Sequence, residues 1–261
     1  MCIRDRQFRP VMDLWKGVET SAEKVLTSPL FHSLCGGVRI CLTQCRRACM
    51  ELFNLYCSAQ LHDLPELREK FPYRRIEPGD MLLCLSHKTR IAVNAHLNRK
   101  LIPHSMDMVV VEATKDPHSQ EMILSKDTPL FCIKTDQERN IWNGMITKVD
   151  SVHPLVIEGE TYTPAQVAAS FRLGYAQTYN SAQGASAKKR VTLFDTGHPR
   201  FSRRHLLVGM SRSSSLSNLA FAPIKWTKRG LPNSTRSLSP MLNYFNAGTL
   251  HLVLWSSGSG D

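Results

Sequence analysis

Polar and basic side chains follow an uninterrupted apolar run in the first half of the chain. Met81 to Leu85 has the length of a buried strand, and a helix is expected from about residue 90 to residue 100. Ser86, His87 and Arg90 end this strand and open this helix. Their side chains and the free N–H groups of a helix start are donors that suit the phosphate backbone of a nucleic acid. For His87, a loop residue that caps the helix is the alternative.

The eight cysteines raise the question of a metal site. Cys41, Cys45 and Cys49 are spaced so that they would share one face of a helix. No His or fourth Cys stands nearby with the spacing of a zinc finger, and the sequence contains no CxxC pair. We therefore expect no metal site, and reduced thiols that pack in the core.

Positive charge is concentrated in the last third of the chain. Of the 33 Lys and Arg residues, 11 lie between Lys188 and Arg236, where Asp195 is the single acid. The rest of the chain is nearly balanced, with 22 basic and 21 acidic residues. Composition alone leaves two interpretations open, a solvated basic face and a surface that binds a polyanion.

The elements that would position these residues alternate between strands and helices. Buried-strand patterns occur at 38–42, 81–85, 191–194 and 206–210, and helical patterns at 26–34, 43–56, 90–100 and 164–172. Residues 107–160 differ, because they consist of short β pieces at 108–112, 122–124, 130–134, 145–149 and 155–157. The alternation predicts an α/β fold with a parallel sheet and a small all-β insertion.

Composition places the chain among folded proteins. Its 42% of hydrophobic residues suffice for one large domain or two small ones. No apolar run reaches the roughly 20 residues of a membrane-spanning helix, and the first residues lack the apolar part of a signal peptide. We expect a soluble, intracellular protein of the cytoplasm or nucleus with no membrane partner. For residues 226–261, a disordered tail and incorrectly translated sequence are equally open.

Several segments, in order, resemble the later motifs of superfamily-1 ATP-dependent helicases of the RecD-like and PIF-type branch. Gln7-Phe8-Arg9-Pro10-Val11 is similar to the end of motif III, and the resemblance makes Gln7 the glutamine that senses the γ-phosphate. Leu42-Thr43-Gln44-Cys45-Arg46-Arg47 is similar to motif IV, in which Arg47 takes the role of an arginine directed at the nucleotide. Arg46 departs from the family, which usually has an aromatic residue there.

Ala176 to Gly184 resembles motif V of the same family. Thr178, Gln183 and Gly184 match position for position, whereas Asn180 and Ser181 replace a His and a Lys. The resemblance implies that Thr178, Asn180 and Ser181 contact nucleic acid, and that Gln183 and Gly184 contact the nucleotide. Because the Lys is absent, one phosphate contact of the family is lost.

Two further segments complete the resemblance. Leu82 to Asn94 looks like the strand, loop and helix that follow motif IV, which supports the nucleic-acid role of the polar residues after the strand. Leu207 to Arg212 is similar to motif VI, and it gives Arg212 the position of an arginine finger that stabilises the transferring phosphoryl group. A buried strand that ends in Ser-Arg is the alternative.

The motifs of the first helicase lobe do not occur in this sequence. It contains no GxxxxGK[ST] phosphate loop, and no Asp-Glu pair follows an apolar strand. The resemblance implies ATP and Mg²⁺, bound mainly by a missing N-terminal lobe, and single-stranded nucleic acid as partner, DNA before RNA. We therefore expect a C-terminal helicase fragment that is inactive alone.

The expected organisation has five parts. Residues 1–17 end the first RecA-like lobe, 18–106 and 161–225 form the second RecA-like lobe, 107–160 form the β insertion, and 226–261 are unassigned. An origin of residues 1–6 outside the natural protein also stays open.

Two alternatives to the helicase remain. One is a non-catalytic basic nucleic-acid-binding module, in which the motif matches are coincidence. The other is a helicase remnant that serves as an interaction module. Charge reversal at Lys188, Lys189 and Arg190 should weaken binding by a basic module, whereas Arg212→Ala should leave that binding intact.

Overall fold

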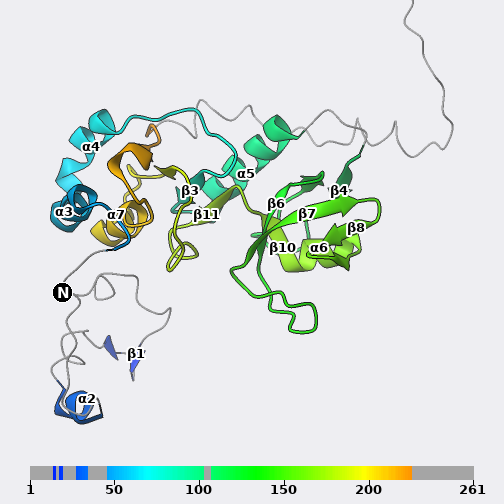
Figure 1. Cartoon of the computed structure of the whole chain (residues 1–261), viewed down its shortest axis with the longest axis horizontal. Helices are drawn as coiled ribbons and strands as arrows, with labels where there is room; N and C mark the ends of the chain where they lie inside the picture. The colour runs from blue at the N-terminus through cyan, green and yellow to red at the C-terminus, as the bar shows by residue number, and fades with distance from the viewer. Residues whose placement is uncertain (1–13, 16–17, 20–27, 35–45, 103–106, 225–261) are drawn as a thin grey trace, which may run out of the picture.

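The computed structural model describes residues 14–15, 18–19, 28–34, 46–102 and 107–224 (Figure 1). Gln7, the strand expected at 38–42 and the unassigned stretch 226–261 lie outside the described residues. The described N-terminal pieces are the antiparallel strands β1 (Leu14–Trp15) and β2 (Val18–Glu19) and helix α2 (Pro29–Leu34). Within the described ranges, no helix combines the length and the apolar character that a membrane crossing requires.

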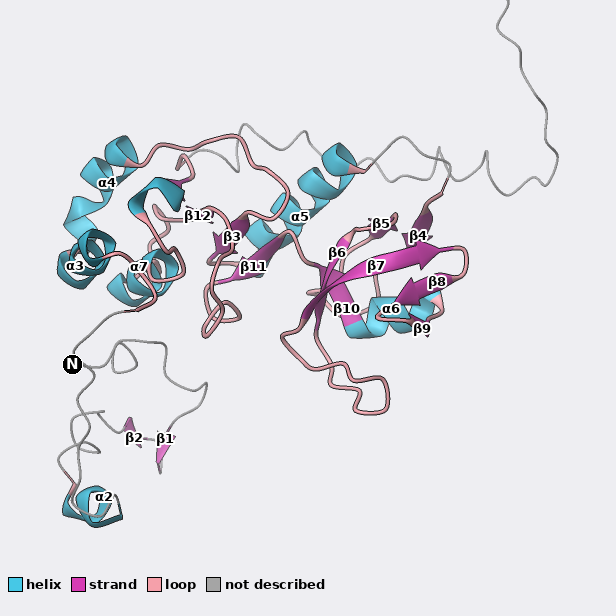
Figure 2. Ribbon diagram, in the orientation of Figure 1, coloured by secondary structure: helices cyan, strands magenta, loops and turns pink. Residues whose placement is uncertain are grey.

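A four-stranded parallel sheet organises the larger unit (Figure 2). In spatial order its strands are β11 (Ala176–Thr178), β3 (Met81–Cys84), β12 (Val191–Leu193) and β13 (Leu219–Phe221). All neighbouring pairs are parallel. A parallel sheet is covered on both faces, which explains why β3 is an uninterrupted apolar run.

Helices cover both faces of this sheet (Figure 1). One face packs against α3 (Met50–Ser58), α4 (Leu64–Lys70) and α7 (Arg203–Met210), and the other packs against α5 (His87–Leu101). Short 3-10 turns occur at Leu61–Asp63 and Leu216–Asn218. Leu83 joins the first core, whereas Leu82 and Cys84 join the second. Because successive strand residues point to opposite faces, β3 contributes to both cores.

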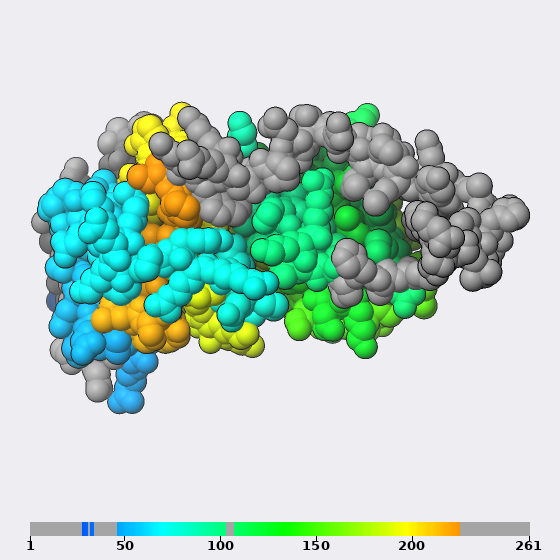
Figure 3. All heavy atoms as spheres, turned by 90° about the horizontal axis from the view of Figure 1, so that it is seen from above, coloured from blue at the N-terminus to red at the C-terminus, as the bar shows by residue number. Residues whose placement is uncertain are grey.

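The segment between α5 and β11 forms an antiparallel β unit with its own core. Its hairpin is β4 (Val109–Val111) with β5 (Met122–Leu124). Its five-stranded sheet has the order β10 (Phe171–Leu173), β6 (Pro129–Cys132), β7 (Ile146–Val152), β8 (Leu155–Ile157) and β9 (Glu160–Thr161), and helix α6 (Pro164–Ser170) packs against it. The space-filling view shows this green unit at one end and the cyan and orange surface of the parallel-sheet unit at the other (Figure 3).

Helix α5 ties the two units together through a buried polar stripe. Arg90, Asn94 and Asn98 are spaced four residues apart, so they lie on one face of the helix. The side-chain amide of Asn94 donates to the carbonyl oxygen of Leu173 over 3.0 Å, and that of Asn98 donates to the carbonyl oxygen of Ile123 over 2.8 Å. These contacts fix β10 and β5 of the antiparallel unit against a helix of the parallel-sheet unit.

The predicted α/β class, with a parallel sheet and a small antiparallel insertion, is confirmed. The strands at 122–124 and 155–157 have the expected bounds. The helix expected from about residue 90 begins earlier, at His87, because the hydroxyl of Ser86 caps it by accepting from the backbone N–H of Thr89. The helical pattern at 164–172 ends at Ser170, where β10 pairs with β6.

Three expectations were wrong. A helix was expected at 43–56, but the described residues 46–49 are not helical and α3 begins at Met50. Residues 206–210 were expected as a strand, but they belong to α7, which begins after a capping box between Ser202 and His205. All five residues are buried, so the run is apolar on every side and carries no helical period. Cys49 is exposed before α3 rather than packed in the core, whereas Cys84 and Cys132 are buried as expected.

Candidate nucleotide and nucleic-acid interface

The loop after β11 carries the residues that resemble motif V. Asn180, Ser181 and Gly184 are exposed on it. The backbone N–H of Thr178 donates to the hydroxyl of Ser181 over 3.1 Å, and the N–H of Ser181 donates to the hydroxyl of Thr178 over 3.2 Å. Gly184 has a φ of +93° and open space where a side chain would stand. The loop therefore presents small polar groups and accessible backbone, which a phosphate can approach closely.

Arg212 follows the end of α7 and is only 1% exposed. Its Nη1 donates to the carbonyl oxygen of Ala185 over 2.7 Å and more weakly to that of Ala182 over 3.4 Å. Its Nε donates to the carbonyl oxygen of Val208 over 3.1 Å. Burial, followed by the charge of Arg47, lowers the pKa of Arg212 to about 10, so the guanidinium stays charged at neutral pH. Arg212 thus fastens the motif V loop to the end of α7.

Arg47 lies near Arg212, although the two are far apart in sequence. It is exposed just before α3, and its charge lowers the pKa of Arg212. The N–H of Cys49 donates to the carbonyl oxygen of Ser214 over 3.0 Å, which holds this segment beside the residues after Arg212. No carboxylate of the described residues forms an ion pair with either arginine. An anion beside both guanidinium groups would relieve their repulsion, so the arrangement fits a phosphate group.

The structure brings most of the predicted nucleotide-contacting residues to one place. Half-buried Gln183 and exposed Gly184 lie on the loop that Arg212 fastens, and Arg47 lies near that arginine. Gln7, the predicted γ-phosphate sensor, lies outside the described residues. The nucleotide roles of Gln7, Arg47, Gln183, Gly184 and Arg212 remain predictions.

The corner between β3 and α5 is arranged differently from the expectation. The carboxylate of Asp195 accepts from the backbone N–H of Leu85 over 3.0 Å and from that of Ser86 over 3.3 Å. It also accepts from the hydroxyl of Thr89 over 2.9 Å. Donors that were expected to face a phosphate are therefore already used by a carboxylate of the chain itself.

The three predicted residues of this corner have different accessibility. His87 is exposed, Ser86 is half-buried and Arg90 is 4% exposed. The guanidinium of Arg90 donates to the carbonyl oxygen of His118, over 2.9 Å. Only His87 is openly available to a ligand in this arrangement.

Asp195 and His118 are residues that the sequence reasoning did not assign to this corner. Asp195 has a φ of +59°, a left-handed conformation that Asp tolerates better than most residues. Its isolation as the single acid of a basic stretch was a usable signal, because such a residue needs a reason to be there. No local pattern marks His118, since its importance comes from contacts with residues distant in sequence.

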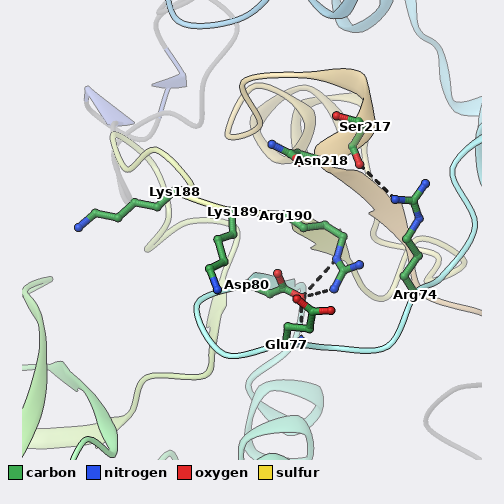
Figure 4. Close-up of a pocket in the computed structure, with 8 residues that line it drawn as sticks. All are labelled: Arg74, Glu77, Asp80, Lys188, Lys189, Arg190, Ser217 and Asn218. Atoms are coloured by element: carbon green, nitrogen blue, oxygen red, sulfur yellow. Dashed lines mark hydrogen bonds and ion pairs between the residues drawn. The ribbon is translucent and has the colours of Figure 1, made fainter.

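The basic residues 188–190 line a pocket of about 320 Å³ at the amino ends of β3, β12 and β13 (Figure 4). Arg190 makes an ion pair with Asp80 over 2.6 Å, and Lys189 donates to the carbonyl oxygen of Pro78 over 2.9 Å. Lys188 points away from these two contacts (Figure 4). The pocket is lined by Arg74, Glu77, Asp80, Lys188, Lys189, Arg190, Ser217 and Asn218.

The described residues also bear on the question of a metal ion. Among them, no group of three or more His, Cys, Asp or Glu side chains is placed to hold one.

No protein-family model and no curated protein matches the sequence. Solved structures do resemble it. The Pif1 helicase from Bacteroides in complex with ADP-AlF3 and single-stranded DNA gives a TM-score of 0.51 at 16% identity, covering 71% of this chain and 52% of that chain. A structure of two coordinating Pif1 helicases at forked double-stranded DNA gives 0.51 at 15% identity, covering 76% of this chain and 57% of that one.

These identities are low, so the likeness concerns the fold. This chain spans little more than half the length of those helicase chains. The parallel sheet with helices on both faces fits a RecA-like lobe, and the antiparallel unit accompanies it. The chain has a helicase-like fold that resembles the fold of Pif1 helicases.

Proposed function

We propose that this chain is the C-terminal part of an ATP-dependent helicase that moves along single-stranded nucleic acid, DNA before RNA. Residues 18–106 and 161–225 would form its second RecA-like lobe, with 107–160 as the insertion. The order of the motifs and the helicase-like fold support this proposal. The observation that carries it is the convergence of Arg47, Arg212 and the motif V loop on one place.

The chain's part in the reaction follows from this convergence. ATP with Mg²⁺, held mainly by a lobe outside this chain, would supply the phosphoryl group whose charge needs stabilisation. Arg47 and Arg212 provide positive charge for it, and a planar guanidinium can offer two parallel hydrogen bonds. Gln7 would sense the γ-phosphate, and Gln183 and Gly184 would line the nucleotide side of the loop.

Arg212 also offers a physical link between nucleotide and strand. Its guanidinium holds the carbonyl groups of Ala182 and Ala185, and a turn of Arg212 toward a phosphate would release them. The same loop carries Thr178, Asn180 and Ser181, which we assign to the strand. Ser86, His87 and Arg90 adjoin this loop, because the N–H of Tyr179 donates to the carbonyl oxygen of Cys84 at the end of β3.

The test compares the purified chain with the complete protein, obtained by reading the native transcript upstream of Gln7. We expect no ATP turnover by the chain alone, and turnover stimulated by single-stranded DNA in the complete protein. Arg212→Lys keeps the charge but not the forked geometry, so it should lower turnover by about 10³-fold. Urea unfolding of the same variant should show a loss of unfolding free energy that is too small to explain this drop in turnover.

Arg74→Lys provides the matched control. Arg74 is an exposed arginine of the pocket in Figure 4, so its replacement should leave turnover unchanged. The proposal is overturned if the chain alone hydrolyses ATP, if Arg212→Lys retains full turnover, or if the upstream frame encodes no phosphate loop.

A second candidate is the non-catalytic basic nucleic-acid-binding module. It is favoured by exposed Arg74 and Lys188 at the pocket, where Arg190 is neutralised by Asp80. In that case Lys188→Glu should weaken binding to an oligonucleotide and reduce its dependence on salt. Arg212→Lys would then leave every measured activity unchanged.

A further inference from the structure

Two exposed histidines stack on each other where the two units meet. His87 is the first residue of α5, and His118 lies between β4 and β5. Their ring centroids are 4.0 Å apart and their planes are inclined by 27°. Exposed aromatic rings in a fixed arrangement are what a nucleobase can stack on, because every base has a flat π-face.

The backbone of His118 is held from both units. Its carbonyl oxygen accepts from Arg90 of α5 over 2.9 Å, and its N–H donates to the carboxylate of Asp116 over 2.8 Å. The carboxylate of Asp116 is itself paired with Arg172 of β10 over 2.9 Å. The backbone of His118 is therefore held at two points, and its exposed ring is placed by the stack on His87, which lowers the ordering cost of binding a ligand there.

The charge around the stacked rings is positive. Arg90 is 4% exposed, and burial followed by the charge of Arg172 lowers its pKa to about 10, so it remains charged at neutral pH. The Nε atoms of Arg90 and Arg172 are buried and have no hydrogen-bond partner. Within the described part of the chain, Asp116 is the carboxylate that pairs with Arg172, and its charge also acts on Arg90. A ligand with a phosphate beside a flat ring would complement both features.

The state of His87 suits stacking as well. Burial, followed by the charges of His118, Arg90 and Arg172, lowers the pKa of His87, while Asp116 acts in the opposite direction. The lowered pKa favours the uncharged form of the His87 imidazole.

We propose that His87 and His118 form a stacking platform for one nucleobase of the bound strand, with Arg90 and Arg172 supplying positive potential for its phosphate. This inference rests on the proposed binding of a single strand and adds His118, from the antiparallel unit, to the strand's path. The platform lies at the carboxyl end of β3, beside the loop of Thr178 and Ser181 that we assign to the strand. One strand can therefore contact both.

The experiment measures fluorescence anisotropy of the full chain with two labelled 12-nucleotide probes, oligodeoxythymidine and an abasic strand of equal charge. Wild type should bind the thymidine strand more tightly. His118→Ala should weaken thymidine binding by about 5-fold or more, the loss typical of one base stack, and leave abasic binding unchanged. His118→Phe retains a ring and should retain the preference for bases.

His153→Ala is the matched control, because His153 is an exposed histidine in the turn between β7 and β8. It should bind both probes as wild type does. Equal wild-type binding of the two probes, or an equal loss on both with His118→Ala, would overturn the platform while strand binding stands. If wild type binds neither probe, the proposed strand binding itself fails. Urea midpoints of all variants should agree, since the substituted rings are exposed.

Discussion

Arg190 and Arg212 are two largely buried arginines whose charges are balanced in different ways. The side chain of Arg190 is 14% exposed and meets Asp80, a carboxylate that is 2% exposed, over 2.6 Å. Arg212 is 1% exposed, and its hydrogen-bond partners among the described residues are carbonyl groups and the hydroxyl of Ser211. Its neighbouring charge is a second cation, Arg47. The chain neutralises Arg190 with a carboxylate, whereas it holds Arg212 with uncharged acceptors.

The difference shows that the number of basic residues in a stretch does not by itself identify a surface that binds a polyanion. Arg190 belongs to the stretch with 11 basic residues, yet Asp80 neutralises its charge. Arg203, from the same stretch, donates to the carbonyl oxygens of Cys57 and Ala59 and joins α7 to α3. Lys188 is exposed, and its side chain points away from the pair of Arg190 and Asp80 (Figure 4). Net charge indicates a polyanion-binding surface only after the basic residues that are bonded within the fold have been left out of the count.

The largest effect on stability is expected at the neutralised arginine. Arg190→Met leaves the carboxylate of Asp80 buried without its cation, which should lower the free energy of unfolding by about 3 kcal/mol. Asp80→Asn in the same chain should restore most of the loss, because the uncompensated charge is gone. Urea unfolding of the two single variants and the double variant measures the coupling.

Lys188→Met is the control for this cycle. It removes an exposed positive charge two residues away and should change stability by no more than about 0.5 kcal/mol. Additive effects of Arg190→Met and Asp80→Asn would break the comparison, because they would mean that Asp80 is not the group that balances Arg190.

A smaller loss is expected at Arg212. Arg212→Met removes charged donors from the carbonyl groups of Ala185 and Val208, and this should cost about 2 kcal/mol of unfolding free energy. Asp80→Asn should not restore this loss, since Asp80 pairs with the other arginine. A rescue by Asp80→Asn would show that the two arginines share one charge network and would remove the distinction between them.

The sequence predicted the elements better than the contacts. Periodicity and turn residues were sufficient for β5, β8 and most of α5, because each depends on local pattern. The pattern failed for α7, whose buried residues 206–210 are apolar all round and so resemble a strand. Ser202, a good N-cap residue, marks the true start of α7. This capping signal is stronger evidence for a helix than a five-residue apolar run is for a strand.

For the candidate site too, the sequence predicted some features and missed others. The resemblance selected Arg47, Arg212 and the loop of Gly184, and the structure brings these together. It also assigned Arg90 to the nucleic acid, but Arg90 is buried and donates to the carbonyl oxygen of His118, so any effect on a strand comes from its charge and from the residue that it holds. Such roles depend on long-range packing between α5 and the antiparallel unit, which no local spacing encodes.

The smallest expected effect is a pH dependence of stability to which the Arg212 side contributes through His205. The ring of His205 faces Tyr179 and Phe201 and accepts from the backbone N–H of Ser202 over 3.0 Å at the start of α7, the helix that ends before Arg212. Burial lowers the pKa of His205 below its usual value near 6.5. The native state then binds fewer protons than the unfolded state, so this contribution is complete above about pH 6.5 and is lost as the pH falls from there through the lowered pKa.

Chemical denaturation between pH 7.5 and pH 5 measures this slope. His205→Gln keeps an acceptor for the N–H of Ser202 but does not titrate, so it should flatten the pH dependence relative to wild type. His153→Ala, at an exposed histidine, should keep the wild-type slope. His87 and His96, whose pKa values are lowered as well, contribute equally in both variants, so the difference between the two slopes belongs to His205. An unchanged slope in His205→Gln would mean that the start of α7 does not depend on the neutral imidazole.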